Sequence, residues 1–408
     1  MIGQLISSSF LSIATHKPSF KAGKLLKNTN IGVHMNNTFK LSLAAVLVST
    51  AMTANAGISI VDNEEGNFSV GGNVELNFNF EDRESNANDD SEFNQDGRVL
   101  IEFAGEKYTS NGHYVGVKAQ PLFESTGNIA LDDAYFEFGK KDGWAIKAGR
   151  FEAYDMFPVG LDVFLEYSGD TANDLYADGA AYSYQMKEAR GRGSDGQIMY
   201  NQTFGNLYVE VGAMLGDRSD LFKDLGDNQG RRYHGKEITE VKDSFLVRPV
   251  VAYQMGDFTV AASMETNLVS DAIVAGDIDV SDRTGYGLTG NWTSGDWSVN
   301  TSVAYLDAVD ENNMSVGANA LWNNLGLGYI YSSNEYQSKD WAEGDVNVST
   351  WYASYAFRDV LEVQDFSILL GTYYTMVDNK LTQQPNVEPN AFAEEDDFGA
   401  RVRLYYEF

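Results

Sequence analysis

The stretch FGARVRLYYEF, residues 398–408, alternates between apolar and polar side chains over its whole length. One face carries Phe398, Ala400, Val402, Leu404, Tyr406 and Phe408, and the other carries Gly399, Arg401, Arg403, Tyr405 and Glu407. A period of two residues is typical of a β-strand with one apolar and one polar face. The stretch is also long enough to cross a bilayer at a tilt. It therefore predicts a membrane-spanning strand whose charged face points into the interior of a barrel.

The same alternation recurs along most of the chain. We expect about sixteen strands, near residues 68–80, 99–103, 115–119, 133–138, 144–148, 197–203, 206–215, 245–255, 258–268, 285–293, 296–306, 315–322, 325–333, 348–357, 365–376 and 398–408. Pro249 lies within one of them and cannot donate a ladder hydrogen bond. A bulge there, or a later start of that strand, is the expected consequence.

The connections between these strands alternate between short and long. Short ones fall near 108–111, 140–143, 204–205, 256–257, 294–295 and 323–324, and very long ones include 152–195 and 216–243. Outer-membrane barrels have short periplasmic turns and long external loops. Four tryptophans, Trp144, Trp292, Trp297 and Trp322, stand beside short turns, where an aromatic girdle belongs. The pattern predicts an all-β transmembrane antiparallel barrel with long external loops. The alternative, a soluble β-sandwich or β-helix, does not explain why short and long connections alternate.

The composition narrows the possible chemistry. The 408 residues include 39 Gly, 6 Pro, 23 Tyr, 23 Phe and no Cys. Many aromatic residues and few prolines favour strands. The absence of Cys excludes disulfides, thiolate catalysis and zinc sites with Cys ligands.

Residues 35–56 have the pattern of a secretory signal peptide. Lys40 supplies the positive start, residues 41–52 the short apolar core, and Ala54-Asn55-Ala56 the cleavage site. We interpret Met35 as the true start and residues 1–34 as an upstream misannotated stretch; a soluble pro-segment is the alternative. Residues 57–408 are then the barrel itself.

The mature chain is strongly acidic. Residues 1–56 contain five Lys and no acid, so residues 57–408 carry 24 basic and 59 acidic side chains and a formal charge of −35. Such a surface repels nucleic acid and argues against a nucleic-acid partner. It suits external loops in a layer of lipopolysaccharide bridged by divalent cations, or a channel mouth that attracts cations.

Several short motifs resemble the trimeric sixteen-stranded general and sugar porins of Gram-negative bacteria. They are Val61–Asn67 (VDNEEGN), Asp133-Ala134-Tyr135-Phe136, Gly149-Arg150, Asp155-Met156-Phe157-Pro158, Tyr167–Thr171 (YSGDT) and Tyr200-Asn201. The aromatic and acidic content leans toward carbohydrate porins of the raffinose type. The resemblance implies an outer-membrane homotrimer whose third loop folds into the barrel. It also implies passive diffusion of small hydrophilic solutes, sugars above all, with no cofactor.

In that family, acids of the third loop face basic residues on the wall and narrow the pore. The resemblance assigns Asp155 and Asp170 to the loop and Arg150 to the wall, whereas Asp162 and Glu166 are placed by position alone. Arg401 and Arg403, on the polar face of the last strand, complete the predicted constriction. Further lumen charges are expected at Arg98 and Lys118, and Arg190 and Arg192 either pair with loop acids or form a solvated turn. The loop also offers Phe164, Tyr167 and Tyr176 for stacking on sugar rings, with packing inside the loop as the alternative.

Catalytic and metal-binding patterns are not found. The mature chain has two histidines, His113 and His234, and neither suggests a Ser–His–acid arrangement. The acidic run 88–92 lacks the spacing of an EF-hand. We therefore predict a channel with no reaction, no cofactor and no metal. The alternatives are a non-specific porin that prefers cations and, from another class, an outer-membrane barrel enzyme or an adhesin. Channel conductance separates these classes.

Overall fold

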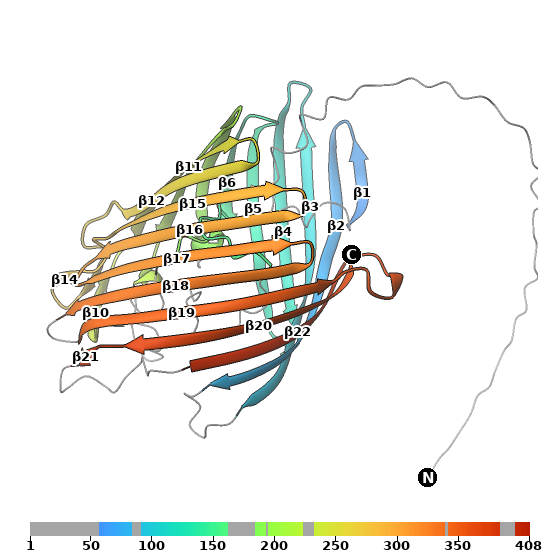
Figure 1. Ribbon diagram of the computed structural model, residues 1–408. Helices are drawn as coiled ribbons and strands as arrows, with labels where there is room; N and C mark the ends of the chain where they lie inside the picture. The colour runs from blue at the N-terminus through green and yellow to red at the C-terminus, as the bar shows by residue number, and fades with distance from the viewer. Residues whose placement is uncertain are drawn as a thin grey trace, which may run out of the picture. The chain divides into compact units, whose positions relative to one another are not determined.

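The computed structural model describes residues 57–83, 91–161, 184–192, 195–222, 232–338, 342–383 and 396–408. Sixteen antiparallel strands close into a barrel (Figure 1), because β2 pairs with β3 on one side and with β22 on the other. The barrel strands are β2 (Gly66–Arg83), β3 (Glu92–Tyr108), β4 (His113–Glu124), β5 (Ile129–Lys140), β6 (Trp144–Arg150), β7 (Gln197–Phe204), β8 (Leu207–Gly216), β11 (Ser244–Met255), β12 (Phe258–Asn267), β15 (Thr284–Ser294), β16 (Trp297–Ala308), β17 (Glu311–Trp322), β18 (Leu325–Ser338), β19 (Ala342–Phe357), β20 (Phe366–Asn379) and β22 (Asp396–Glu407). The predicted fold class and strand number are confirmed.

Short elements surround this frame. β1 (Ile58–Asn63) folds back on the start of β2, and β21 (Thr382–Gln383) extends β19. The 3₁₀ turns are η2 (Glu188–Gly191), η3 (Ser219–Leu221) and η4 (Val360–Glu362). No helix within the described residues is both long and apolar enough to cross a membrane. The sequence pattern missed β1, and it placed the start of the β2 strand at residue 68.

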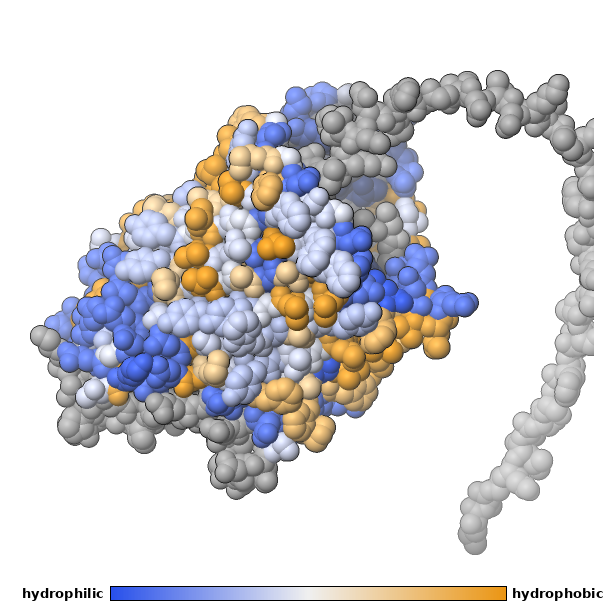
Figure 2. All heavy atoms as spheres, viewed as in Figure 1, coloured by the Kyte–Doolittle hydropathy of each residue, from blue (hydrophilic) through white to orange (hydrophobic). Residues whose placement is uncertain are grey.

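The phase of β22 is the predicted one. Phe398, Val402 and Tyr406 are exposed on the outside, whereas Arg401 and Arg403 are buried on the inside. Apolar residues form patches over the strand surface among residues of intermediate hydropathy, and strongly hydrophilic residues gather toward the strand ends (Figure 2). An apolar outer band over a polar interior is the pattern of a barrel that spans lipid.

The tryptophan girdle is also confirmed. Trp144 begins β6, Trp297 begins β16, Trp322 ends β17 and Trp292 lies two residues before the end of β15, each beside a short turn. The rings of Trp297 and Trp322 stack across the strand pair, with centroids 5.8 Å apart. Amphipathic aromatic rings are stable at the level of the lipid headgroups, which places the short turns at one membrane interface.

The expectation at Pro249 is wrong. β11 begins at Ser244, and Pro249 pairs with Val211 of β8 without a change of register. On the other side, the ladder to β12 has no pairs between Val247↔Thr266 and Val250↔Ser263, and the register is the same before and after this gap. The proline therefore interrupts the bonding locally, and the strand does not need an extra residue.

A second, four-stranded sheet is built from two of the long connections, β8–β11 and β12–β15. Its strands are β9 (Arg232–Tyr233), β10 (Lys236–Val241), β13 (Ile273–Ala275) and β14 (Ile278–Asp279), and we call this sheet the cap. β10 pairs with β13 and so joins the two connections. The sequence predicts loops in both stretches, because strands this short show no measurable alternation.

Candidate functional site

The third loop folds into the barrel, as predicted. Its described parts are residues 151–161 and 184–192, and they pair with each other through the backbone: Ala153 N–H donates to Glu188 O at 3.0 Å, and Met156 N–H to Met186 O at 3.0 Å. The first part then reaches the far wall. There Asn319 Nδ2 of β17 donates to the carbonyl of Pro158 at 2.8 Å, and Tyr352 Oη of β19 donates to that of Val159 at 2.6 Å.

Glycines in the far wall make room for this loop. Phe157 and Tyr184 are completely buried, and each fits over a position without a side chain. A Cβ built on Gly317 would lie 2.9 Å from the Phe157 ring, and one on Gly285 would lie 2.0 Å from Tyr184 Oη. Real Cβ atoms do not approach other atoms this closely. The missing side chains are therefore what allows the loop to lie against the wall.

A buried ion pair fixes the return of the loop. Arg190 Nη2 lies 2.8 Å from Glu265 Oε1 of β12, and Arg190 Nε lies 3.2 Å from Oε2. Both side chains are almost fully buried. The guanidinium also lies over the Tyr184 ring, at 4.8 Å from its centroid. A bidentate arrangement of this kind restricts orientation as well as distance.

Arg192 is the centre of a second cluster. Its guanidinium lies 2.8 Å from Asp132, 2.6 Å from Asp133 and 3.0 Å from Glu152. Burial raises the pKa of Glu152 to about 7, against the opposing effect of Arg192. The predicted pairing with loop acids is seen only between Arg192 and Glu152; the other partners of Arg192 lie on β5, and Arg190 pairs with Glu265 of β12.

Asp155 has a local structural role. Its Oδ1 accepts a hydrogen bond from the Phe157 N–H at 2.8 Å, which shapes the loop just where Phe157 enters the wall. Burial, followed by the nearby carboxylate of Glu188, raises the pKa of Asp155 well above its ordinary range. A carboxyl held in this way contributes less charge to the lumen than a solvated one.

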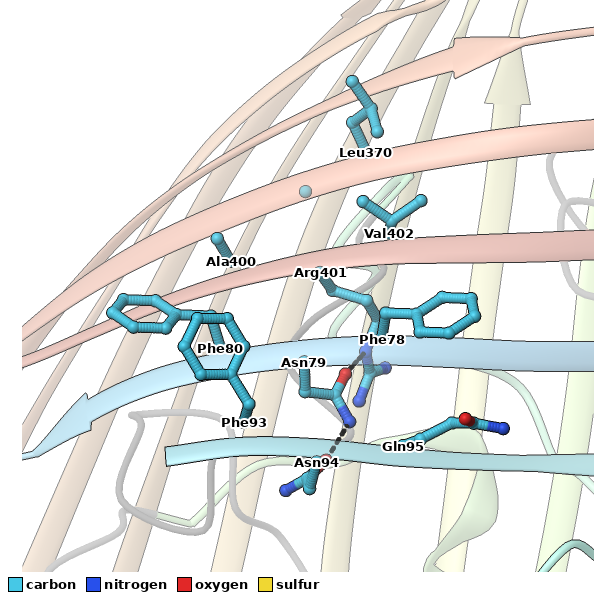
Figure 3. Close-up of a pocket in the computed structure, with 11 residues that line it drawn as sticks. Phe78, Asn79, Phe80, Phe93, Asn94, Gln95, Leu370, Ala400, Arg401 and Val402 are labelled. Carbon is cyan, nitrogen blue, oxygen red and sulfur yellow. Dashed lines mark hydrogen bonds between the residues drawn. The ribbon is translucent and has the colours of Figure 1, made fainter. Parts of the chain in front are cut away.

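Arg401 and Arg403 point inward and are held by a ladder of amides. Arg401 Nε donates to Asn79 Oδ1 at 2.7 Å, and Arg403 Nε donates to Asn77 Oδ1 at 2.8 Å. The Nδ2 groups of both asparagines donate to the carboxylate of Asp96, at 2.6 Å each. Asn79 lies between Arg401 and Asn94 in Figure 3. The ladder spans β22, β2 and β3 and fixes both guanidinium groups.

Opposite charges alternate along the rest of this wall. Glu75 lies 3.2 Å from Arg98 and 3.6 Å from Arg403. Further pairs join Glu102 to Lys118 at 2.9 Å and Glu137 to Lys147 at 3.1 Å. The side chains of these last two pairs are 16–19% exposed, and that of Arg98 is 30% exposed. We call the inward face of β22 and β2–β6 the charged wall.

The opposite side of the barrel differs. On the inward face of the described strands β15–β20, Glu311 is the one charged side chain. We call this face the neutral wall. Apart from Glu311, its polar groups are neutral and mostly buried, and they include Asn300, Ser302, Asn313, Ser315, Asn319, Ser332, Asn334, Thr350, Ser354 and Thr375.

A hollow on the outer surface does not belong to the channel. It lies between β20, β22, β2 and β3, and its apolar lining includes Phe78, Phe93 and Val402 (Figure 3). Phe93 is 80% exposed, which shows that these side chains point away from the lumen. Arg401 and Asn79 line only the inner side of the same strands.

The structure places only part of the predicted constriction inside the barrel. Asp155, Arg401 and Arg403 lie inside the barrel. Arg150, at the end of β6, shares the outward phase of Ile146 and not that of Lys147, and its Nε donates to the carbonyls of Leu131 at 2.8 Å and Asp132 at 2.7 Å. Its pore role stays a prediction. Asp162, Glu166, Asp170, Phe164, Tyr167 and Tyr176 lie outside the described residues.

Sequence reasoning missed the acidic partners on the charged wall. Glu75, Glu102 and Glu137 each fall on the polar face of an alternating strand, so the signal that placed Arg403 inside also applied to them. It missed Tyr184 and the glycines beneath it for a different reason: no periodicity marks a contact between a loop and a distant strand. Across the described ranges, no group of three or more His, Asp or Glu side chains could hold a metal ion.

Comparison with known proteins agrees with this architecture. The model of a protein family described as porin-like glycoporin RafY matches residues 37–408. No curated protein matches the sequence. Among solved structures, Salmonella typhi OmpF in complex with daunomycin has a TM-score of 0.54 at 14% identity and covers 86% of this chain and 100% of its own.

Two other solved outer-membrane proteins are similar in fold. An anion-selective porin from Comamonas acidovorans has a TM-score of 0.53 at 11% identity, and a trimer form of OmpT from Vibrio cholerae has 0.51 at 14%. Each covers 84% of this chain and is itself covered completely. Identities this low support the fold alone, whereas the family match extends over nearly all the chain. The chain therefore belongs to the porin-like glycoporin RafY family and forms a channel in the outer membrane of a Gram-negative bacterium.

Proposed function

We propose that the channel passes small neutral sugars by passive diffusion and that, among ions, it prefers cations. The observation that carries this proposal is the division of the lumen into two walls. The third loop lies against the neutral wall, so the partly exposed pairs on the charged wall remain to line the path. Each pair offers hydrogen-bond donors and acceptors side by side, which suits sugar hydroxyls that both donate and accept.

The preference for cations follows from the balance of charge. The inward acids of the charged wall include Glu75, Glu81, Asp96, Glu102, Glu106, Asp133, Glu137, Asp397 and Glu407, and the inward bases include Arg98, Lys118, Lys147, Arg401 and Arg403. The excess is negative. Rings of charge in a narrow pore set ion preference, because screening by water is weaker there.

The constriction itself is proposed from the third loop. Asp162, Glu166 and Asp170 would add negative charge opposite Arg401 and Arg403, and Asp155 would support the loop through its bond to Phe157. Arg150 would contribute a positive charge to the constriction from the end of β6. In the same loop, Phe164, Tyr167 and Tyr176 would stack on sugar rings. The inward course of residues 151–161 supports this arrangement.

Two further proposals concern export and assembly. We expect cleavage after Ala56, so that the mature chain begins at Gly57; the family match, which begins at residue 37, supports a start near Met35. We also expect a homotrimer in contact with outer-membrane lipid and lipopolysaccharide. The trimer form of the similar OmpT supports it. N-terminal sequencing tests the first proposal, and the mass of the unheated complex in detergent tests the second.

The central experiment combines two measurements on the purified protein. The reversal potential in a planar bilayer under a salt gradient should report cation preference, and Asp162→Asn with Glu166→Gln should reduce it. Liposome swelling with a series of neutral sugars should show uptake. An anion-selective wild type would contradict the charge argument, and swelling by none of the sugars would contradict sugar passage.

A second candidate, a non-specific cation-preferring porin, is favoured by the negative excess alone. The two candidates differ in how uptake depends on the sugar. A non-specific pore sorts sugars by size only, whereas a sugar channel distinguishes stereoisomers of equal mass. We also propose that no reaction is catalysed. Hydrolytic turnover by a preparation that forms no channels would favour the enzyme class.

A further inference from the structure

The cap is folded inward over the barrel wall. Its buried core includes Ile238 of β10 and Ile273 of β13, packed together with Met214 of β8 and Leu246 of β11. Both of these strand residues belong to the inward faces of their strands. The cap therefore lies on the lumen side of the β8–β11 wall, at the end of the strands where β10 and β14 are seen in Figure 1.

The tip of the cap is attached to a different part of the wall. Tyr233 Oη donates to the carbonyl of Val309, in the turn between β16 and β17, at 2.7 Å. The next residue, His234, places Nε2 2.7 Å from Glu311 Oε2 on β17. The ring of Tyr336, on β18, meets the His234 ring edge to face at 5.6 Å. Three contacts thus join the end of β9 and the turn that follows it to the neutral wall.

The attachment explains the one charge of the neutral wall. The side chains of His234 and Glu311 are 2% and 1% exposed. A buried carboxylate is costly unless it is hydrogen-bonded. Glu311 receives a bond from the Asn313 amide of its own strand, and its other oxygen faces the cap histidine. The other inward groups of this wall are neutral, and Glu311 lies at the point where the cap contacts the wall.

The geometry points to a bridge across the mouth. β11 and β17 are four strand steps apart, roughly 19 Å along the wall at about 4.8 Å a step. A structure rooted at β8 and β11 and attached at β17 and β18 crosses the lumen side of this arc. We propose that the cap is a second selectivity element, a size filter at the external mouth, and that His234 and Glu311 form the clasp that holds it across the arc.

The clasp is tested by pairwise exchange. His234→Ala and Glu311→Gln should each release the tip of the cap and raise the swelling rate for a tetrasaccharide, relative to a monosaccharide, at least threefold. The combination of His234→Glu with Glu311→His keeps both partners and should restore the wild-type ratio. His113→Ala, at an exposed histidine, is the matched control. Folded single variants with the wild-type ratio would overturn the clasp.

The position of the cap is tested without disturbing its core. The natural chain has no Cys, so Asp277→Cys, in the exposed turn between β13 and β14, gives one reactive site. A polyethylene-glycol maleimide attached there should lower single-channel conductance by half or more. Thr126→Cys, in the exposed β4–β5 connection, should give a much smaller loss. Equal losses at both sites would overturn the proposal, whether or not the clasp variants fold and whether or not sugars pass.

Discussion

The neutral wall and the charged wall have the same alternation of inward and outward side chains, but the third loop covers the neutral wall and leaves much of the charged wall open. Phe157 and Tyr184 are buried against the neutral wall, over Gly317 and Gly285. On the charged wall, pairs such as Glu137 and Lys147 keep part of their surface exposed. The neutral wall therefore serves as a seat for the loop, and the charged wall remains as lining. The difference shows that an inward position in a barrel does not by itself indicate contact with solute.

The electrostatics of the two walls follow from this division. A charge placed under the loop would lose its hydration, and such a loss exceeds the gain from most ion pairs unless the geometry is very good. The neutral wall under the loop accordingly has neutral groups. On the neighbouring strands, the charges that the loop covers are all bonded: Glu265 pairs with Arg190, Arg248 donates to three loop carbonyls, and Glu210 accepts from the Tyr154 N–H. Charges on the lining stay near water and need only partial compensation.

The largest expected effect is loss of the pair that fixes the loop to the wall. Arg190→Ala leaves Glu265 buried without its partner and should destabilise the protein by about 3–5 kcal/mol. Unfolding in detergent, followed by heat modification on gels, measures it. Adding Glu265→Gln removes the unpaired charge and should recover part of the loss. A double variant no more stable than Arg190→Ala would mean that the pair is not the anchor.

The next prediction compares the two faces of one strand. Leu404→Arg puts a charge on the lipid side of β22 and should cost roughly 2–4 kcal/mol. Arg403→Ser, one residue away on the inner face, should still assemble and should change conductance, because Arg403 bonds to Asn77 and Glu75 in the lumen. Equal assembly yields for the two variants would show that the strand phase is wrong.

A smaller effect is expected when one methyl group is added to a glycine under the loop and, for comparison, to a glycine on the charged wall. Gly285→Ala forces Tyr184 to move and should cost about 1–3 kcal/mol through overpacking, with a rise in conductance as the loop shifts. Gly116→Ala, on the charged wall, is the control, since its nearest neighbour would lie 3.5 Å away. It should change neither stability nor conductance. The idea of a glycine-lined seat fails if the two variants behave alike.

Much of the barrel could be predicted because period-two alternation is a local signal. It gave the phase of β22, the position of the tryptophan girdle and the parity of the turns. The walls could be assigned only in part, since alternation says which residues face inward and not what covers them. The seat at Gly285 and Gly317 depends on a loop far away in sequence. Strands as short as β9 and β14 carry no pattern at all, so the sequence predicts loops where the cap forms.

The smallest expected effect comes from the protonation of a single carboxyl group, that of Glu152. Glu152, beside Arg192, has a side chain that is 29% exposed, and burial raises its pKa to about 7. This pKa lies above the ordinary value of 4.5 for glutamic acid, so the folded protein holds this proton more strongly, and stability should fall slightly as the pH rises through 7. Over the same interval the lumen gains one negative charge.

Cation preference should therefore rise between pH 6 and pH 8. A unit charge about 10 Å from a passing ion contributes roughly 0.4 kcal/mol in water, a factor of about two in the permeability ratio. Reversal potentials at pH 6, 7 and 8 measure it, and Glu152→Gln should make the ratio independent of pH over this range. Glu102→Gln, on the charged wall away from the Arg192 cluster, should lower the preference at every pH but keep the pH-dependent rise. If the rise survived in Glu152→Gln, the titrating group would lie elsewhere, and the acids of the third loop outside the described residues would be the next to exchange.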